Sequence, residues 1–474
     1  MLFDSIDFIL FLPIVFLVYW FVLSKNLAAQ NFFLIIASYV FYAWWDYRFL
    51  FLLMFSTFLD YFTGLKIHSS SFQRTKKAWL VASIGINLGF LGFFKYYNFF
   101  IESFAGFLEV LGFQANVWTL NVILPVGISF YTFHGLSYVL DVYYGRVKPT
   151  RNFVDYGLFV SYFPLLVAGP IERATHLLPQ VQRPRTFHYS QAADGLRQIL
   201  WGMFQKIVIA DNCAEYANKI FDNYQQHNGI TLFIGAVLFA FQIYGDFSGY
   251  SSIAIGVSRL FGIELLQNFS FPYFSRDIAE FWRRWHISLS SWFRDYLYVP
   301  LGGNKGGLLK KIRNTFIIFL VSGFWHGANW TFIAWGALNA IYFLPLLIAG
   351  KNRRNLEIVP HFSIANLLKI GFTFCLVCFA WIFFRSENIT EAFDYFRIMF
   401  TSPSLHFPSF ISIYIFLMLV VFVLVEWAGR SGRYALENIK YVKNTPARWA
   451  IYYTIVASIV FFNGTKQEFI YFQF

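Results

Sequence analysis

The chain has little charge and very little cysteine. Only 13% of its 474 residues are Asp, Glu, Lys or Arg, against about 25% in a typical soluble protein, and this deficit excludes an ordinary soluble enzyme. Cys213, Cys375 and Cys378 are too few for a disulfide framework. The last two lie within the apolar run 372–384, so we expect small core residues rather than a redox pair.

Apolar and aromatic residues are abundant instead. Hydrophobic residues make up 58% of the chain and aromatic residues 23%, with 63 Phe, which excludes disordered and low-complexity proteins. The net charge is +12, and the basic residues fall mostly between the apolar runs, as they do in cytoplasmic loops. The chain is therefore expected to lie in a lipid bilayer and not to bind nucleic acid. We predict one all-α integral membrane domain over residues 1–474.

Apolar runs that approach the roughly 20 residues needed to cross a bilayer recur along the whole chain, and we expect about eleven true spans. They are residues 6–23, 31–45, 49–65, 78–94, 122–144, 153–168, 198–210, 230–261, 315–350, 367–384, 411–427 and 449–462. The basic loop 66–77 is expected in the cytoplasm, which places the N-terminus outside. Because Asp4 and Asp7 precede the first run and no cleavage site follows it, we expect that run to remain as a span.

Two of the runs are predicted to be irregular. Basic loops flank the run 153–168 on both sides, which a complete span does not allow, so we expect it to be re-entrant. Gly245 and Asp246 interrupt the run 230–261, and a carboxylate there is costly unless it has a partner. Asp246 is expected to face the interior and to hold two broken helices together by hydrogen bonds, in preference to direct catalysis.

The segment 272–350 is dense in tryptophan and charge, and it contains two histidines. A stripe at helical spacing predicts one amphipathic helix, with Arg283, His286 and Ser290 on another face. The stripe comprises Trp282, Trp285, Leu289 and Trp292. An interfacial anchor would account for such a stripe, but it does not account for His286, because Lys or Arg would anchor better.

His326 follows Arg313 by 13 residues, or about 20 Å along a helix, which is near the middle of a bilayer. A packed, hydrogen-bonded histidine is the structural alternative to a functional one. An apolar environment disfavours the imidazolium, so this side chain is expected to be neutral and able to act as a general base in acyl transfer, with His286 stabilising the oxyanion. No Gly-x-Ser-x-Gly motif and no zinc-ligand spacing accompanies the histidines, so no covalent serine and no metal are predicted.

These residues resemble the membrane-bound O-acyltransferases. Within that family the match is to the membrane subunits of bacterial alginate O-acetyltransferases, and more distantly to the teichoic-acid D-alanyl transfer proteins. The matching segments are FWRRWHISLS at 281–290, YLYVPLGGN at 296–304 and SGFWHGA at 322–328, with GPIER at 169–173, PQ at 179–180 and DFSGY at 246–250 upstream. Together these segments extend the resemblance over essentially the whole chain.

The resemblance implies a ring of membrane helices with re-entrant and interfacial helices around a central tunnel. It also implies that His326 is the active-site histidine and His286 its companion, with Trp325 and Asn329 as neighbours. Acetyl-CoA is the implied acyl donor, a substrate and not a bound cofactor, and it arrives from the cytoplasm. Basic residues at Arg173, Lys305, Lys310 and Lys311 would attract its phosphates.

The aromatic C-terminal tail, residues 469–474, reads FIYFQF. From composition it is an interfacial anchor. In teichoic-acid D-alanylation, however, a small protein ends in F-x-Y-x-x-F with a tyrosine thought to carry the acyl group, and this tail has the same spacing. The likeness leads to the hypothesis that Tyr471 receives the acetyl group inside the tunnel.

The predicted function is transfer of acetyl from acetyl-CoA across the bacterial inner membrane for O-acetylation of an exported, alginate-like polysaccharide. An extracytoplasmic SGNH-type acyltransferase is expected to complete the reaction, because we find no segment here that would hold a polymer outside. Acyl transfer to peptidoglycan or teichoic acid is one alternative. A polysaccharide or lipid transporter is another, since broken helices and midplane polar groups are typical of transporters; inverted repeats would favour it, and the halves show no similarity.

Overall fold

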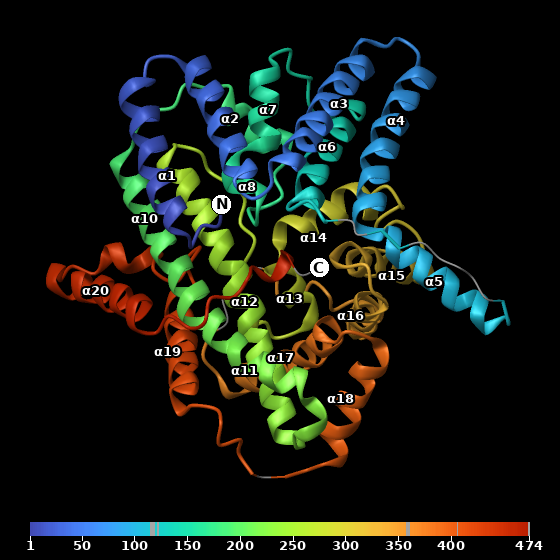
Figure 1. Cartoon of the computed structure of the whole chain (residues 1–474), viewed down its shortest axis with the longest axis vertical. Helices are drawn as coiled ribbons and strands as arrows, with labels where there is room; N and C mark the ends of the chain where they lie inside the picture. Colours follow the sequence, from blue (N-terminus) through green and yellow to red (C-terminus); the bar gives the residue numbers. More distant parts are fainter. Residues whose placement is uncertain (114–118, 121–122, 357–360, 405, 473–474) are drawn as a thin grey trace. The chain divides into compact units, whose positions relative to one another are not determined.

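The computed structural model describes residues 1–113, 119–120, 123–356, 361–404 and 406–472, apart from the side chain of Tyr471, and over this range every regular element is helical (Figure 1). The helices form two compact units. Unit 1 comprises Met1–Ala192 and Val257–Leu266, and unit 2 comprises Ala193–Gly256 and Gln267–Phe474. The prediction of one domain over the whole chain stays a prediction.

Unit 1 is built from the N-terminal helices, and α3 packs on α4 and α6 while α2 packs on α7 and α8. Its helices are α1 (Ile6–Leu17), α2 (Leu27–Ala43), α3 (Leu50–Ser69), α4 (Gln73–Leu91), α5 (Tyr97–Val110), α6 (Ile128–Tyr143), α7 (Phe153–Ser161), α8 (Phe163–Leu166) and α9 (Ala174–Val181), with π-helical turns η1 (Val18–Val22) and η3 (Gly92–Tyr96) and the 3₁₀ turn η2 (Tyr47–Phe49).

Unit 2 holds the histidine-containing segment and the tail. Its helices are α10 (Tyr189–Met203), α11 (Asp211–Asp222), α12 (Gly229–Leu260), α13 (Ile278–Arg284), α14 (Ile287–Phe293), α15 (Leu308–His326), α16 (Trp330–Ile348), α17 (Ile364–Arg385), α18 (Ile389–Thr401), α19 (Ile413–Gly429) and α20 (Thr445–Phe461). Shorter turns are η4 (Phe204–Ala210), η5 (Tyr224–Gln226), η6 (Pro272–Phe274), η7 (Arg294–Tyr298), η8 (Glu437–Tyr441) and η9 (Ile470–Phe472). The start of α10 and the end of α12 belong to unit 1.

Many of these helices begin where a short polar side chain caps the first turn. Asn329 accepts a hydrogen bond from the Thr331 amide at 3.0 Å, and Asp277 accepts one from the Glu280 amide at 2.7 Å. Such caps satisfy amide groups that have no partner within the helix. The cap at Asn329 starts α16 directly after α15, so the predicted run 315–350 is divided by a break at residues 327–329.

Among the described residues, five helical segments are long and apolar enough to cross a membrane, and the chain is a multi-pass membrane protein. They are Tyr47–Ser69, Gln73–Val110, Gly229–Leu260, Trp330–Ile348 and Ile364–Arg385, with shorter apolar helices at Ile6–Val22, Leu27–Ala43 and Ile413–Gly429. The expected count of eleven spans stays a prediction. The run 153–168 forms only α7 and α8, of nine and four residues, which are too short to cross a bilayer.

The expected break in α12 is wrong, because this helix runs unbroken for 32 residues. Glycine here serves close packing. A Cβ atom at Gly245 would lie 2.8 Å from the carbonyl oxygen of Gln205, and one at Gly249 would lie 2.8 Å from that of Gly202. Small residues let membrane helices approach each other in this way, so the glycines fix where α12 meets the α10–η4 segment.

Candidate functional site

His286 stands at a sharp break between two short helices of unit 2. The predicted single amphipathic helix is wrong, since α13 ends at Arg284 and α14 starts at Ile287. His286 adopts a left-handed conformation with φ +43°, which is uncommon for a residue other than glycine and costs about 1–3 kcal/mol. Its side chain is only 1% exposed. Such strain is typical of residues held in place for function.

A segment distant in the sequence holds this break in place. The Ile287 amide donates to the Asn268 carbonyl oxygen at 2.8 Å, and the Ser288 hydroxyl donates to Asn268 Oδ1 at 2.6 Å. The interfacial-anchor interpretation is also wrong for Trp285 and Trp292, because both are buried in the protein. Helical spacing could not reveal these contacts, since Asn268 lies outside the periodic segment.

His326 is the last residue of α15, and its ring is enclosed by aromatic side chains. The ring centres of Trp325, Trp335 and Phe384 lie 4.9, 5.1 and 5.3 Å from that of His326. The next residue, Gly327, is essential for this enclosure, because a Cβ atom there would lie 2.0 Å from the Phe332 ring. The His326 imidazole is thus packed among aromatic rings and is only 4% exposed.

The two histidines come together although 39 residues of sequence separate them. Their ring centres are 6.4 Å apart, and Trp325 contacts both rings, at 5.9 Å from His286. Burial lowers the pKa of His286 to about 3, so this imidazole is neutral at physiological pH. Two imidazoles at this separation can exchange protons with a group placed between them.

A cavity of about 240 Å³ is lined by residues of α13, α14, η7, α15 and α16, and neither histidine belongs to its lining. Its polar lining includes Ser290, Arg294, Ser322 and Arg353. Ser322 and His326 are four residues apart in α15, so they share one face of that helix. The part of the cavity wall formed by Ser322 is therefore one helical turn from His326. Ser290, predicted to support the site, lines this cavity and donates to the Trp285 carbonyl oxygen at 3.4 Å.

Asp246 faces the interior as predicted and belongs to a buried ionic cluster. Lys206 Nζ lies 2.9 Å from Asp246 Oδ1 and 2.8 Å from Asp211 Oδ1, and all three residues are buried. Sequence reasoning missed Lys206, although a lysine within the apolar run 198–210 was a signal that it pairs with the one acid of the run 230–261. The cluster joins η4, α11 and α12.

The C-terminal tail reaches this cluster, as the red end of the chain returning to α12 shows (Figure 1). The Ile470 amide donates to Asp246 Oδ2 at 2.6 Å, and Lys206 Nζ donates to the Gln467 carbonyl oxygen at 3.0 Å. Phe469 is fully buried. Tyr471 belongs to η9 by its backbone, but its side chain lies outside the described part of the chain.

Phe247 connects the tail to the histidines. Its ring centre is 6.3 Å from Phe469 and 4.7 Å from His286, with perpendicular rings in the second contact. The interfacial-anchor interpretation of the tail is therefore wrong for Phe469 and Ile470, which are buried in unit 2. Asp246 and Phe247 are neighbours in α12, so one turn of that helix contacts both the tail and the site.

A second buried acid also escaped the sequence interpretation. Glu426 in α19 is 4% exposed; it accepts hydrogen bonds from the Tyr244 hydroxyl at 3.0 Å and from Gln205 Nε2 at 3.3 Å. Tyr244 in turn packs on Trp285, with ring centres 6.0 Å apart. The position of Glu426 near the end of the apolar run 411–427 was a signal in the sequence that this acid is buried and paired.

The remaining predicted residues are dispersed. Lys305 and Lys310 are exposed, and Lys311 is half-buried. Asn329 uses both ends of its amide structurally, since its Nδ2 also donates to the Glu387 carbonyl oxygen at 2.6 Å. Arg173 belongs to unit 1 and is buried, so the four basic residues predicted to bind the donor fall in different units.

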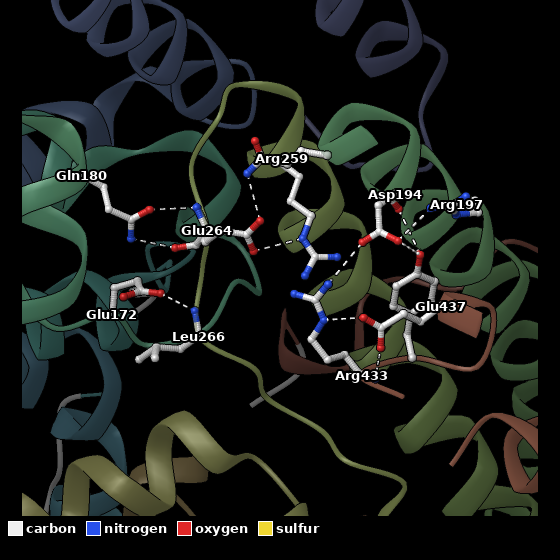
Figure 2. Close-up of polar contacts among 11 residues, drawn as sticks. Glu172, Gln180, Asp194, Arg197, Arg259, Glu264, Leu266, Arg433 and Glu437 are labelled. Atoms are coloured by element: carbon white, nitrogen blue, oxygen red, sulfur yellow. Dashed lines mark hydrogen bonds and ion pairs between the residues drawn. The ribbon is translucent and has the colours of Figure 1, made fainter. Parts of the chain in front are cut away.

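The upstream motifs in unit 1 hold the chain segment that follows α12 (Figure 2). Glu172 Oε1 accepts from the Leu266 amide at 2.6 Å. Gln180 accepts from the Glu264 amide and donates to the Glu264 carbonyl oxygen, both at 2.9 Å. Figure 2 also shows Asp194 of unit 2, which accepts from Arg197 at 3.0 Å. The motif residues Glu172 and Gln180 therefore position the backbone of Glu264 and Leu266.

Comparison with known proteins assigns the family. The model of the MBOAT, membrane-bound O-acyltransferase family, matches residues 148–386, a range that contains both histidines. The chain belongs to this family. Its members' name identifies it as an O-acyltransferase, as the resemblance predicted.

Individual relatives agree over most of the chain. A probable alginate O-acetylase of Pseudomonas aeruginosa is 40% identical over 85% of this chain and 75% of the relative. One from Azotobacter vinelandii is 38% identical over 92% of this chain and 86% of the relative. A peptidoglycan O-acetyltransferase of Helicobacter pylori is 38% identical over 81% and 76%, and a teichoic acid D-alanyltransferase of Bacillus subtilis is 29% identical over 56% and 70%.

Proposed function

We propose that this chain transfers acetyl groups from cytoplasmic acetyl-CoA across the bacterial inner membrane, for O-acetylation of an exported, alginate-like polysaccharide. The observation that carries the proposal is the buried pair His286 and His326, with ring centres 6.4 Å apart. A cavity wall includes Ser322, which lies one helical turn before His326 in α15. The alginate O-acetylases among the relatives support acetyl as the acyl group.

The acetyl-CoA enters through the cavity with its phosphates outward. Arg294 and Arg353 line the cavity and are exposed, and the basic residues Lys305, Lys310 and Lys311 follow in the chain. Arginine and lysine are the side chains that phosphates prefer. The thioester then lies near Ser322, one helical turn before His326.

Tyr471 is the acceptor inside the protein. His326 takes the phenol proton as the phenol oxygen attacks the acetyl carbonyl carbon, while His286 donates a hydrogen bond to the oxyanion. The carbon–sulfur bond then breaks, and the CoA sulfur takes the proton from His326 and leaves as the thiol. The tail contacts at Asp246 and Phe247 support this placement.

The acetyl group then passes to an SGNH-type partner outside the membrane. A hydroxyl of that partner attacks the acetyl-tyrosine ester, and Tyr471 regains its proton. The partner acetylates the polymer. The N-terminus of this chain is proposed to lie on the same, extracytoplasmic side.

The test is acetyl transfer or slow hydrolysis of labelled acetyl-CoA by the purified protein, with His326→Ala as the variant. We expect the variant to be inactive and His68→Ala, an exposed histidine at the end of α3, to be fully active. Full activity of His326→Ala would remove the proposed base. In cells, Tyr471→Phe should abolish polymer acetylation, whereas Tyr453→Phe, on an exposed tyrosine of α20, should not.

Peptidoglycan is the second candidate acceptor, favoured by the Helicobacter pylori relative. Comparing acetyl ester content of the exported polysaccharide and of the cell wall, with and without the chain, separates the two. Unchanged polymer export with lost acetyl groups would also exclude a transporter.

A further inference from the structure

Unit 1 contains a buried arginine that the proposed chemistry does not use. Arg185 lies between α9 and α10 and is 9% exposed, although its neighbours Arg183 and Thr186 are exposed. A guanidinium carries five N–H donors and stays charged at all physiological pH values. Such a group is rarely buried without a partner of opposite charge.

The described residues leave most of this guanidinium unsatisfied. Arg185 Nη2 donates to Asn31 Oδ1, and the guanidinium carbon lies 5.5 Å from the ring centre of Tyr19. Nε and Nη1 are buried and have no hydrogen-bond partner of normal geometry among the described residues, although the Tyr19 hydroxyl is close enough to interact with the guanidinium. The acid Asp155 is reached only through Asn31, whose Nδ2 donates to Asp155 Oδ1 at 2.9 Å. The arginine therefore lacks a direct counter-ion among the described residues.

A cavity of about 370 Å³ opens beside Arg185, and it combines apolar walls with a polar end. Trp20 and Phe16 face Phe187, with ring centres 5.6 and 6.0 Å apart. Ser24 and Thr186 add hydroxyl groups. The cavity lies at the end of the apolar segment Ile6–Val22, where a membrane helix meets the head-group region.

The two features fit one ligand. Phosphate is a preferred partner of arginine, and a phosphate in the cavity that Arg185 lines would neutralise the charge of the guanidinium. Aromatic walls suit an acyl chain and do not suit a free, hydrated phosphate. Basic pockets beside membrane helices bind anionic lipid head groups, and the exposed Lys25 and Arg183 give the surroundings the same sign.

We propose that Arg185 and this cavity form a binding site for the phosphate of an anionic phospholipid, with one acyl chain against Trp20 and Phe187. The site lies wholly in unit 1 and does not depend on the proposed acetyl transfer. Bound lipid supplies the counter-ion that the protein lacks there.

Native mass spectrometry of the full-length, detergent-purified protein tests the proposal. We expect the wild type to retain one phosphatidylglycerol molecule, at least tenfold more tightly than phosphatidylcholine. Arg185→Gln keeps a donor for Asn31 but removes the charge, and it should weaken phosphatidylglycerol binding at least tenfold. Arg183→Gln removes the same charge from an exposed neighbour and should bind as the wild type does.

A second variant avoids removal of the buried arginine. Thr186→Asp places a carboxylate at the mouth of the cavity, where it competes with the lipid phosphate, and Thr186→Asn is the uncharged control. Phosphatidylglycerol should raise the unfolding temperature of the wild type and of Thr186→Asn but not of Thr186→Asp. Wild-type lipid binding in Arg185→Gln, an equal rise in Thr186→Asp, or equal protection by inorganic phosphate alone would overturn the proposal.

Discussion

Two buried polar sites in unit 2 differ in whether their side chains are charged and paired. Around Lys206, the ammonium lies within 2.9 Å of both Asp211 and Asp246, so every charge has a close partner. Around His286 and His326, the centres of four aromatic rings lie 4.7 to 5.3 Å from the imidazole centres. The first site holds paired ions in place, whereas burial in the second lowers the pKa of His286 and keeps that imidazole neutral.

This difference in charge pairing distinguishes the Lys206 cluster, which contacts the tail, from the histidine pair, for which we propose a chemical role. Lys206 and Asp246 each form a hydrogen bond with the tail backbone. Because both ions are already paired with an opposite charge, proton transfer to or from them is unfavourable. A neutral imidazole can both accept and donate a proton. We therefore propose that the ionic cluster positions the tail and that the histidines transfer the proton.

The largest expected effect tests the histidines as one unit. His326→Gln should lower acetyl-CoA turnover about 10²–10⁴-fold, the usual contribution of a general base. His286→Gln should lower it less, and the double variant should be no slower than His326→Gln alone, because residues that act together are not additive. Independent, multiplying losses in the double variant would show that the two rings act separately.

The ionic cluster should respond in stability. Lys206→Met leaves Asp211 and Asp246 buried without their cation, so the free energy of unfolding should fall by about 3–5 kcal/mol. Thermal unfolding in detergent measures this. The matched control is Lys219→Met, whose 2.7 Å pair with Glu215 is largely exposed and should be worth at most about 1 kcal/mol. Equal losses in the two variants would contradict the role of the buried cluster.

Asp246→Asn should release the tail without unfolding the protein. The variant replaces a charge-assisted bond to the Ile470 amide, worth about 1.5–3 kcal/mol, while Lys206 keeps Asp211. Carboxypeptidase should then digest the tail faster than in the wild type. Asp222→Asn, at an exposed carboxylate, serves as the control. A tail that stays equally resistant in both variants would show that Asp246 does not hold it.

The smallest effect concerns the pH dependence of stability. Burial lowers the pKa of His286 from 6.5 to about 3, so between these values the unfolded chain binds a proton that the folded chain does not. Stability therefore falls as the pH falls below 6.5, by about 1.4 kcal/mol at pH 5.5.

His286→Asn removes the imidazole that binds this proton in the unfolded chain, and asparagine tolerates the left-handed backbone. Thermal unfolding at pH 7.5 and 5.5 should show the smaller loss in this variant, while His68→Asn should behave as the wild type does. The same pH response in His286→Asn as in the wild type would mean that His286 is not the source.

The sequence predicted much of this site, for reasons that particular residues make clear. His326 stood out because an ionisable side chain deep in an apolar run is costly, and the structure brings His286 to it. The broken, short helices of 153–168 followed from the basic loops on both sides. Asp246 was recognised as buried, because a carboxylate in an apolar run needs a partner.

The errors arose where tertiary contacts override local pattern. Tryptophans at helical spacing predicted one helix across His286, but Ile287 and Ser288 donate hydrogen bonds to Asn268 where the helix breaks. Gly245 was interpreted as a helix breaker, whereas it admits the carbonyl of Gln205. Neither Asn268 nor Gln205 lies near its partner in sequence, so periodicity carried no information about these contacts.

The most direct test follows the acetyl group in a single turnover. Purified wild type and His326→Gln are mixed with labelled acetyl-CoA and quenched in acid, and the C-terminal peptide is examined by mass spectrometry. We predict acetyl on Tyr471 in the wild type and none in His326→Gln over the same time. Acetyl on Tyr471 of His326→Gln at the wild-type rate, or complete thioester cleavage by the wild type without label on that peptide, would contradict the assignment.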